Sequence, residues 1–213
     1  MINRKKIIKT AALISGISGL IILIASVWPI IEYQLTDARA YTTLLSPLTE
    51  EKRDFTKASS WFPDATNIKP VVDSKVSFYT VTIPKLKIQD ARVAIGGEDL
   101  SKNLVQYPGT ALPGKNGNAV IFGHSILPIF YNPKNYMAIF STLPTLKEGD
   151  DIFIEYDGIS YEYRVEELFE IYPTDIQILE QNPSDSFITL VTCVPPGDPR
   201  NPKRLIVRAR VVS

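Results

Sequence analysis

The chain contains one cysteine, Cys193, and one histidine, His124, and each closes a run of residues typical of a β-strand. Cys193 ends the run FITLVTC, and His124 ends the run NAVIFGH. A single cysteine cannot form an internal disulfide, and one cysteine with one histidine is too few for a typical structural zinc site. At strand ends the two side chains can converge on a surface cleft, where a thiolate attacks a carbonyl carbon and an imidazole moves protons. The alternative is that Cys193 is a small buried side chain without chemistry, which is the commoner role of a lone cysteine.

A third candidate follows Cys193 after a short loop. Residues 194–203 contain four prolines and therefore cannot form a regular strand or helix. The loop must return the chain so that Arg204 opens a neighbouring strand beside Cys193. A guanidinium at that position could stabilise an oxyanion and favour a thiolate. Equally, Arg204 could belong to a basic cluster on a solvated face, together with Arg200, Lys203, Arg208 and Arg210.

The N-terminal segment indicates a membrane location. Residues 10–31 carry no charged side chain, and a helix of that length spans roughly 33 Å, enough for a hydrocarbon core of about 30 Å. Basic residues precede the segment and no acidic residue occurs before Glu32, so we expect residues 1–9 to be a cytoplasmic tail. The alternative is a cleaved signal peptide, but the sequence SVWP at 26–29 is a poor cleavage site. We therefore expect a single-pass transmembrane anchor over 10–31, with the rest of the chain outside the cytoplasm.

Residues 32–75 are mostly polar and predict an extracytoplasmic stalk. Two adjacent aromatic residues, Trp61 and Phe62, stand out within this linker. They could pack against the side of the following domain, or they could belong to a loop that covers the active site. Both interpretations stay open.

From residue 76 to 213 the sequence changes to short β-type runs separated by Gly, Pro, Asn and Asp, with Asp157-Gly158 as a tight hairpin signal. The fold class that this pattern predicts is mainly β: seven or eight strands in about 140 residues imply a closed or nearly closed barrel, since closure removes exposed edges. Residues 135–146 predict one short helix. The predicted strands are 77–83, 91–95, 119–124, 151–156, 160–165, 168–172, 187–193 and 205–212.

Composition limits the partners. The formal net charge is zero, which gives no indication of nucleic-acid binding. The scattered acidic residues form no recognisable calcium site, so we expect no metal and no cofactor.

Three motifs in the order His, Cys, Arg resemble the sortase family. The segment 189–193 (TLVTC) matches the TLxTC signature of sortases, and 204–208 (RLIVR) matches their arginine strand. The run 107–114 (YPGTALPG), followed by Gly123-His124, is similar to the region that leads to the sortase histidine, and PGTALPG is typical of class D or E. The resemblance covers roughly residues 76–212. Many relatives have Arg directly after the histidine, whereas this chain has Ser125.

The resemblance implies an anchored cysteine transpeptidase with an eight-stranded sortase-type β-barrel. Such enzymes cleave an LPxTG-like sorting signal of surface proteins or pilins between Thr and Gly. They transfer the acyl group to an amine of a cell-wall precursor or of a pilin lysine. By position, Cys193 is then the nucleophile, His124 the general acid and base, and Arg204 the oxyanion donor. Four further residues are expected to contact the substrate: Thr192, Ile176, Ile178 and Leu179.

Two other classes remain alternatives at this point: a peptidoglycan-directed cysteine enzyme, of the L,D-transpeptidase or the papain-like type, and a non-catalytic anchored β-domain. L,D-transpeptidases also use a cysteine after a histidine on a β-rich fold, but they carry an SHGC-type motif that Thr192-Cys193 lacks. Papain-like wall hydrolases have the opposite order, with the cysteine before the histidine. A non-catalytic anchored β-domain would instead leave Cys193 inert and inaccessible.

Overall fold

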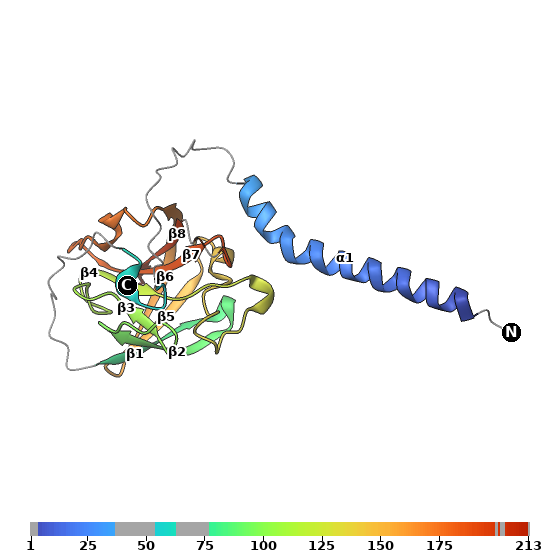
Figure 1. The fold of residues 1–213 in the computed structure, drawn as a ribbon. Coiled ribbons are helices and arrows are strands. Elements are labelled where there is room, and N and C mark those ends of the chain that lie inside the picture. Colours follow the sequence, from blue (N-terminus) through green and yellow to red (C-terminus); the bar gives the residue numbers. More distant parts are fainter. Residues whose placement is uncertain (1–3, 37–53, 63–76, 199, 201–202, 213) are drawn as a thin grey trace. The chain divides into compact units, whose positions relative to one another are not determined.

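The computed structural model describes residues 4–36, 54–62, 77–198, 200 and 203–212. In its first helix it describes the side chains of residues 12–28. Parts of the predicted tail and stalk therefore lie outside the described residues. The chain divides into two units, Met1–Leu48 and Thr49–Ser213. The first contains α1 (Arg4–Thr36) and the second a β-barrel (Figure 1).

Eight strands in the described part of the chain close into a barrel with the order β1-β2-β3-β4-β7-β8-β6-β5. The pairs β2–β3 and β4–β7 are parallel, and the other neighbouring pairs are antiparallel. This confirms the predicted mainly β, closed eight-stranded barrel. The strands are β1 (Phe78–Ile83), β2 (Ile88–Ile95), β3 (Leu104–Gln106), β4 (Gly117–Phe122), β5 (Asp151–Tyr156), β6 (Ile159–Ile171), β7 (Ser186–Val194) and β8 (Lys203–Val211).

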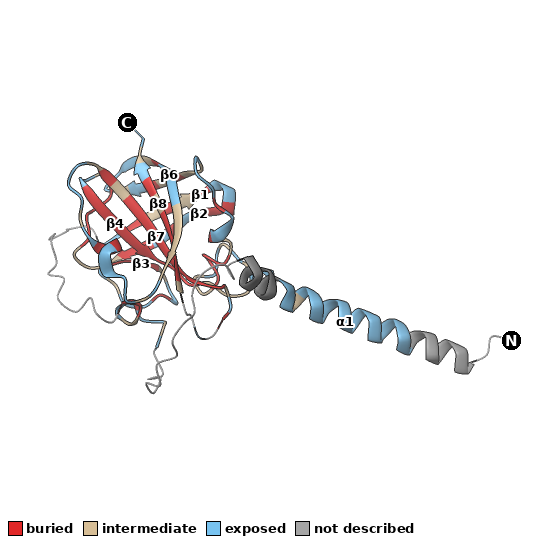
Figure 2. Cartoon of the chain, turned by 90° about the horizontal axis from the view of Figure 1, so that it is seen from above, coloured by how far each residue is buried: buried red, intermediate tan, exposed pale blue. Residues whose placement is uncertain are grey.

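Strands β4 and β7 lie among the most buried elements (Figure 2). Every residue of β4 is buried, and so are eight of the nine residues of β7. Both strands are runs of apolar and small residues without the polar alternation of a half-exposed strand, which is typical of strands covered on both faces. The barrel interior covers one face. The residues at the ends of β4 and β7 are therefore carried by two buried, neighbouring strands.

The short connections differ from the sequence prediction in three places. Leu104–Gln106 forms β3, which was not predicted, because three residues are too few for a periodic signal. The predicted strands 160–165 and 168–172 are one strand, β6, with an irregularity between Val165 and Glu167. The predicted helix at 135–146 is wrong: the segment consists of turns and one 3-10 turn, Leu143–Thr145, and Pro144 lies inside it.

Short 3-10 turns lie in several of the connections between strands. The predicted hairpin at Asp157-Gly158 is confirmed, since both residues have positive φ (52° and 75°), as a type I′ turn demands. The 3-10 turns are η1 (Ala58–Ser60), η2 (Pro84–Leu86), η3 (Pro128–Phe130), η4 (Leu143–Thr145) and η5 (Ile176–Leu179).

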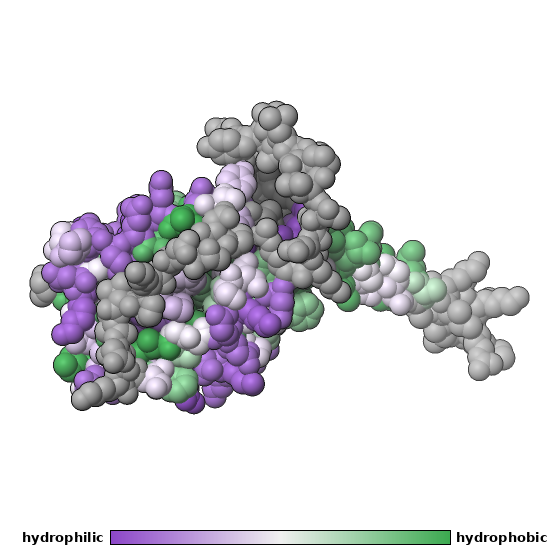
Figure 3. Space-filling model, turned by 60° about the vertical axis from the view of Figure 1, so that its left-hand side comes forward, coloured by the Kyte–Doolittle hydropathy of each residue, from purple (hydrophilic) through white to green (hydrophobic). Residues whose placement is uncertain are grey.

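Helix α1 contains the segment in which the anchor was predicted. Its large apolar side chains, such as Ile14, Ile22 and Trp28, are exposed. The described part of the helix is mostly apolar, whereas hydrophilic residues predominate on the barrel face seen in Figure 3. Among the residues that the structure describes, no helix is both long and apolar enough to cross a membrane, so the predicted transmembrane helix at 10–31 is not supported.

Residues 54–62 fall within the predicted stalk, but they pack against the barrel, and we refer to them as the cover segment. An isolated β-bridge joins Lys57 to Asp99, and the Trp61 and Phe62 side chains are buried. The two aromatic residues in this polar linker, Trp61 and Phe62, therefore indicated that the linker packs against the barrel.

Candidate active site

The ends of three neighbouring strands bring the predicted chemical side chains together. Cys193 on β7 is the direct antiparallel partner of Arg204 on β8. On its other side β7 runs parallel to β4, where Phe122 is the partner of Val191. His124 follows Phe122 by two residues, as Cys193 follows Val191, so that the imidazole and the thiol lie at the same level.

These side chains lie on the outer face of the barrel. Because side chains alternate along a strand, Arg204 shares its face of β8 with Arg208 and Arg210, whose charged groups reach solvent. The intervening residues fill the interior: Leu205, Val207 and Ala209. Cys193, as the direct partner of Arg204, points to the same side.

The cover segment nevertheless shields this outer face from solvent. The Trp61 ring stacks on Phe122, with a centroid distance of 5.3 Å and an interplanar angle of 12°, and its centroid lies 5.8 Å from that of His124. Cys193 is 4% exposed and His124 is 8% exposed. The structure therefore supports both interpretations of Trp61 and Phe62: they pack on the domain, and in doing so they cover the site.

Arg204 is held by the same segment. Its guanidinium carbon lies 5.3 Å from the Trp61 ring centroid and 5.5 Å from that of Phe55, which are cation–π distances. It also donates hydrogen bonds to the backbone oxygens of Trp61 (3.4 Å) and Lys203 (3.2 Å). Arg204 is thus fully buried and fixed in orientation, whereas Arg200 in the loop pairs with Asp198 and has a side chain that is 66% exposed.

Burial sets the protonation of both candidate catalytic groups. It lowers the pKa of His124 from its usual 6.5 to about 4, although the carboxylates of Asp54 and Asp99 act in the opposite direction. It raises the pKa of the Cys193 thiol from 9.0 to about 11, against a smaller lowering by the Arg204 guanidinium. Among the described residues, none forms a hydrogen bond with His124 Nε2. Near pH 7 the covered site therefore holds a neutral imidazole and a neutral thiol.

Two side-chain hydrogen bonds tie the end of β4 to the end of β7. The Ser125 hydroxyl donates to the backbone oxygen of Cys193 (2.6 Å), and the Thr192 hydroxyl donates to that of Gly123 (2.8 Å). Ser125 thus contacts the backbone of the residue that carries the thiol. Thr192 was predicted to contact the substrate, but it lies on the opposite face of β7 from Cys193, is fully buried and uses its hydroxyl within the protein.

Gly123 shows how closely the chain is packed at this point. A Cβ at this position would lie 2.5 Å from the Phe140 ring and 2.6 Å from a Leu104 methyl group. Glycine therefore allows the chain to pass beneath these side chains and place His124 beside Cys193.

Two of the three predicted signal-binding residues of η5 lie at the site. Ile178 and Leu179 are buried in one apolar cluster with Trp61, Phe62 and Cys193. Ile176 is 37% exposed and does not belong to this cluster. The apolar surface available to a substrate is therefore formed by η5 and is occupied by the cover segment.

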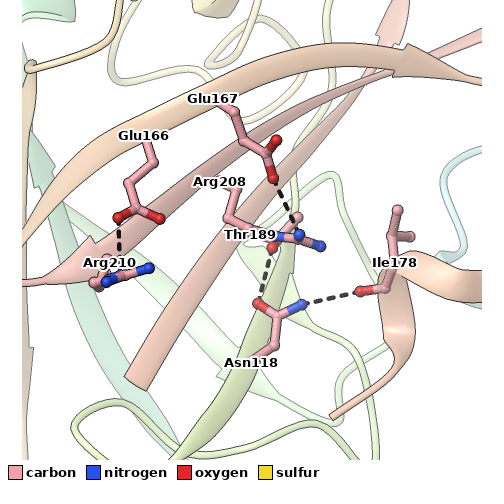
Figure 4. A network of polar contacts seen from close by, with 7 residues as sticks. All are labelled: Asn118, Glu166, Glu167, Ile178, Thr189, Arg208 and Arg210. Atoms are coloured by element: carbon pink, nitrogen blue, oxygen red, sulfur yellow. Dashed lines mark hydrogen bonds and ion pairs between the residues drawn. The ribbon is translucent and has the colours of Figure 1, made fainter. Parts of the chain in front are cut away.

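The polar side chains that hold η5 in place were not found from the sequence. Asn118 at the start of β4 accepts a hydrogen bond from the Thr189 hydroxyl (2.8 Å) and donates one to the backbone oxygen of Ile178 (2.9 Å; Figure 4). Nothing in the local pattern distinguishes Asn118 from a turn residue. Among the described residues, no group of three or more His, Cys, Asp or Glu side chains is placed to bind a metal ion.

Comparison with known proteins gives consistent matches. A family model described as Sortase domain matches residues 81–212. A curated relative, Sortase A of Bacillus anthracis, is 27% identical over 175 residues, which cover 76% of this chain and 77% of that protein. Sortase A of Streptococcus agalactiae is 25% identical over 117 residues, which cover 55% of this chain and 45% of that protein.

Solved structures extend the likeness to three dimensions. A Clostridium perfringens Sortase D5 transpeptidase has a TM-score of 0.55 and 27% identity, with 67% of this chain and 82% of that chain covered. Sortase A from Corynebacterium diphtheriae has a TM-score of 0.55 and 30% identity over 66% of this chain and 62% of that chain. A pilus-related Sortase C of Group B Streptococcus has a TM-score of 0.56 and 28% identity, covering 66% and 70%.

Proposed function

Since the chain belongs to the sortase family, whose members are cysteine transpeptidases, we propose that it cleaves an LPxTG-like sorting signal and transfers the acyl group to an amine. The donor is a surface protein or a pilin, and the acceptor is a cell-wall precursor or a pilin lysine. The observation that carries the proposal is the direct pairing of Cys193 with Arg204, at the level of His124. The family match favours neither the L,D-transpeptidase nor the non-catalytic alternative.

In the proposed mechanism, the uncovered Cys193 thiol gives its proton to His124, and the resulting thiolate attacks the carbonyl carbon of the signal's Thr. The Arg204 guanidinium donates hydrogen bonds to the resulting oxyanion. The C–N bond to Gly then breaks as the His124 imidazolium protonates the leaving amine, which leaves a thioester on Cys193. The incoming amine loses a proton to neutral His124 as its nitrogen attacks the thioester carbon, and Cys193 leaves as a thiolate.

Catalysis in this scheme requires the cover segment to move. While Trp61 is in place, Cys193 and His124 are both neutral near pH 7 and almost inaccessible. The Trp61 backbone oxygen already accepts a hydrogen bond from Arg204, as the substrate carbonyl must. The cover segment and the sorting signal therefore compete for the same donor and the same apolar surface.

A membrane location is part of the proposal. Its support is the uncharged segment 10–31 with basic residues before it, together with the exposed apolar side chains of α1. The proposed arrangement has residues 1–9 in the cytoplasm and the barrel outside the membrane. A reporter fused after Ser213 should then be found outside the cytoplasmic membrane, and protein extracted from cells should begin near Met1. A mature N-terminus near Trp28 would indicate a cleaved signal instead.

The reaction is tested with the full-length chain, a fluorescent LPxTG peptide and an added amine such as triglycine. We expect cleavage between Thr and Gly, an acyl adduct on Cys193 detectable by mass spectrometry, and transfer to the added amine. Cys193→Ala and His124→Asn should each remove the activity and leave the barrel folded. Near-normal turnover by Cys193→Ala would rule out the thioester mechanism, and cleavage of peptidoglycan stem peptides instead of the LPxTG peptide would favour the L,D-transpeptidase alternative.

A further inference from the structure

Two adjacent large apolar side chains of the barrel are left in solvent close to the active site. Ile129 and Phe130, in the turn η3, are 67% and 64% exposed, more than any other large apolar residue in the described part of the barrel. We refer to these two residues as the apolar pair. The turn begins four residues after His124. Apolar side chains that a fold leaves exposed together, among polar neighbours, are typical of a contact with another molecule or with lipid.

The loop that carries the apolar pair is held on both sides. Leu127 packs against Gly197, where a Cβ would lie 2.6 Å from the Leu127 side chain. The Tyr131 hydroxyl donates a hydrogen bond to the backbone oxygen of Leu86. The residues that flank the apolar pair therefore bind to the barrel, and the exposure of the pair belongs to a loop of defined conformation.

The apolar pair lies at the end of the barrel that carries the catalytic groups. The Ser125 hydroxyl donates a hydrogen bond to the backbone oxygen of Cys193 (2.6 Å). Gly197, against which Leu127 packs, follows Cys193 by four residues. A surface that contacts the apolar pair therefore lies close to this end of β7.

Basic residues lie beside the apolar pair. The turn η2 contacts the loop through the backbone oxygen of Leu86, and the residues on either side of it, Lys85 and Lys87, are exposed. Lys134 is exposed in the same loop as the pair. Because Lys85 is paired with Asp150 at 2.6 Å, the positive charge comes from Lys87 and Lys134.

Acidic residues are absent from the segment that forms this loop. No Asp or Glu occurs from Leu100 to Lys147, although the chain has 23 acidic residues, and the same stretch contains four lysines. On β2, which follows η2, Asp90 and Arg92 carry opposite charges. The described residues around the apolar pair therefore have a net positive charge, which is complementary to an anionic surface.

The size of the apolar pair favours a lipid surface over a protein partner. A stable protein interface buries about 800 Å² on each partner, far more than two side chains of one turn provide. A membrane needs less, because a few apolar side chains enter the headgroup region while neighbouring lysines attract anionic lipids.

We propose that the barrel docks on an anionic lipid membrane through Ile129 and Phe130, with Lys87 and Lys134 against the headgroups. The inference rests on the proposed membrane location, which brings the barrel and the lipid together. It goes beyond that location because the barrel itself makes the contact. Docking of this kind holds the end of the barrel that carries Cys193 close to the lipid surface.

The experiment places an environment-sensitive fluorophore in the apolar pair of the full-length chain. Because Cys193 is the only cysteine, Ile129→Cys in a Cys193→Ala background has one labelling site. The labelled protein is reconstituted into vesicles of phosphatidylcholine with or without the anionic lipid phosphatidylglycerol. With phosphatidylglycerol we expect a blue shift of the emission and quenching by nitroxide-labelled lipid. Both should weaken at 1 M salt, where the Debye length falls to about 3 Å.

Ile159→Cys in the same background is the matched control. Ile159 is also an exposed isoleucine, at the start of β6. It precedes Ile171, the register partner of Arg204, by twelve residues, which corresponds to about 40 Å at 3.3 Å per residue. A fluorophore at the opposite end of the barrel from the active site should be neither shifted nor quenched.

Substitutions around the labelled site test the two parts of the contact. Phe130→Ser should lower the ratio of docked to undocked protein about 10-fold, because burial of a large apolar side chain is lost. Lys87→Gln and Lys134→Gln should each lower it about 5-fold, as expected for one basic residue at an anionic surface. Lys115→Gln should leave it unchanged, because this exposed lysine precedes β4, at the end of that strand away from His124. Thermal unfolding checks that each variant is folded.

Equal quenching of the fluorophores at the two sites overturns the docking. Quenching that depends neither on phosphatidylglycerol nor on Lys87 and Lys134 also overturns it. A blue shift that grows with protein concentration in the absence of lipid assigns the apolar pair to a second copy of the chain instead. Cleavage of the LPxTG peptide and the location of the reporter are measured separately, so the docking and the proposed function can fail independently of each other.

Discussion

Replacing Trp61 with Ala should uncover Cys193 and shift its pKa from about 11 towards the usual 9.0, because burial is the largest cause of the upward shift. At pH 8 the thiolate fraction would rise from about 0.001 to at most about 0.1, a gain of about 100-fold. The intrinsic nucleophilicity of a thiolate falls with its pKa, which removes about 10-fold of that gain. Ionisation alone should therefore speed alkylation of Cys193 by about 10-fold, and access of the reagent should add to this.

The assay is alkylation by iodoacetamide, followed by mass spectrometry across pH 6 to 11. Because the chain has one cysteine and one histidine, alkylation reports Cys193 alone, and NMR titration of imidazole protons reports His124 alone. The same substitution should raise the pKa of His124 from about 4 towards 6.5. If Trp61 covers both side chains, its removal must lower the pKa of Cys193 and raise the pKa of His124 together.

Trp61→Phe should give smaller shifts, since it keeps an aromatic ring near His124 but loses the indole hydrogen bond to the backbone oxygen of Phe55 (2.8 Å). Phe130→Ala removes an exposed aromatic residue outside the cover segment and should change neither pKa. A thermal unfolding curve checks that the barrel of Trp61→Ala stays folded. If the alkylation midpoint of a folded Trp61→Ala protein stays near 11, the cover segment does not control Cys193.

Three further predictions follow from the site. Arg204→Ala and Arg204→Lys should each lower kcat about 100- to 1000-fold, because Arg204 is a preorganised hydrogen-bond donor. Arg200→Ala should lower kcat only slightly, because the Arg200 side chain is exposed. If kinetics show the reverse order, Arg200 in the loop is the oxyanion donor. Ser125→Ala should lower kcat about 5-fold, the worth of one hydrogen bond, since it frees the Cys193 carbonyl; an unchanged kcat would show that this bond positions nothing. The folded pKa of His124 (about 4) lies below its usual 6.5, so the closed state should lose up to roughly 3 kcal/mol as the pH falls through this range. The protection factor of the Trp61 indole against hydrogen exchange, which is the observed rate corrected for the intrinsic rate at each pH, should therefore fall in acid, and this fall should be absent from His124→Asn.

The sequence alone determined the chemical groups and their order along the chain. Cys193 and His124 are unique in the chain, and the apolar runs that end in them predict strands because buried strands have a short-range pattern. The same reasoning placed Arg204 at the start of the returning strand, as the register confirms. It did not predict Leu104–Gln106, and it predicted a helix near Pro144, because short irregular connections carry no periodic signal.

The tertiary structure decided whether these groups can react. Trp61 is distant in sequence from both His124 and Arg204, yet it contacts both side chains, and no local pattern encodes that contact. Burial beneath Trp61, rather than residue type, makes both His124 and Cys193 neutral near pH 7. A pKa depends on the solvent that the fold removes from a side chain, so the sequence could identify the imidazole and the thiol but could not give their charge.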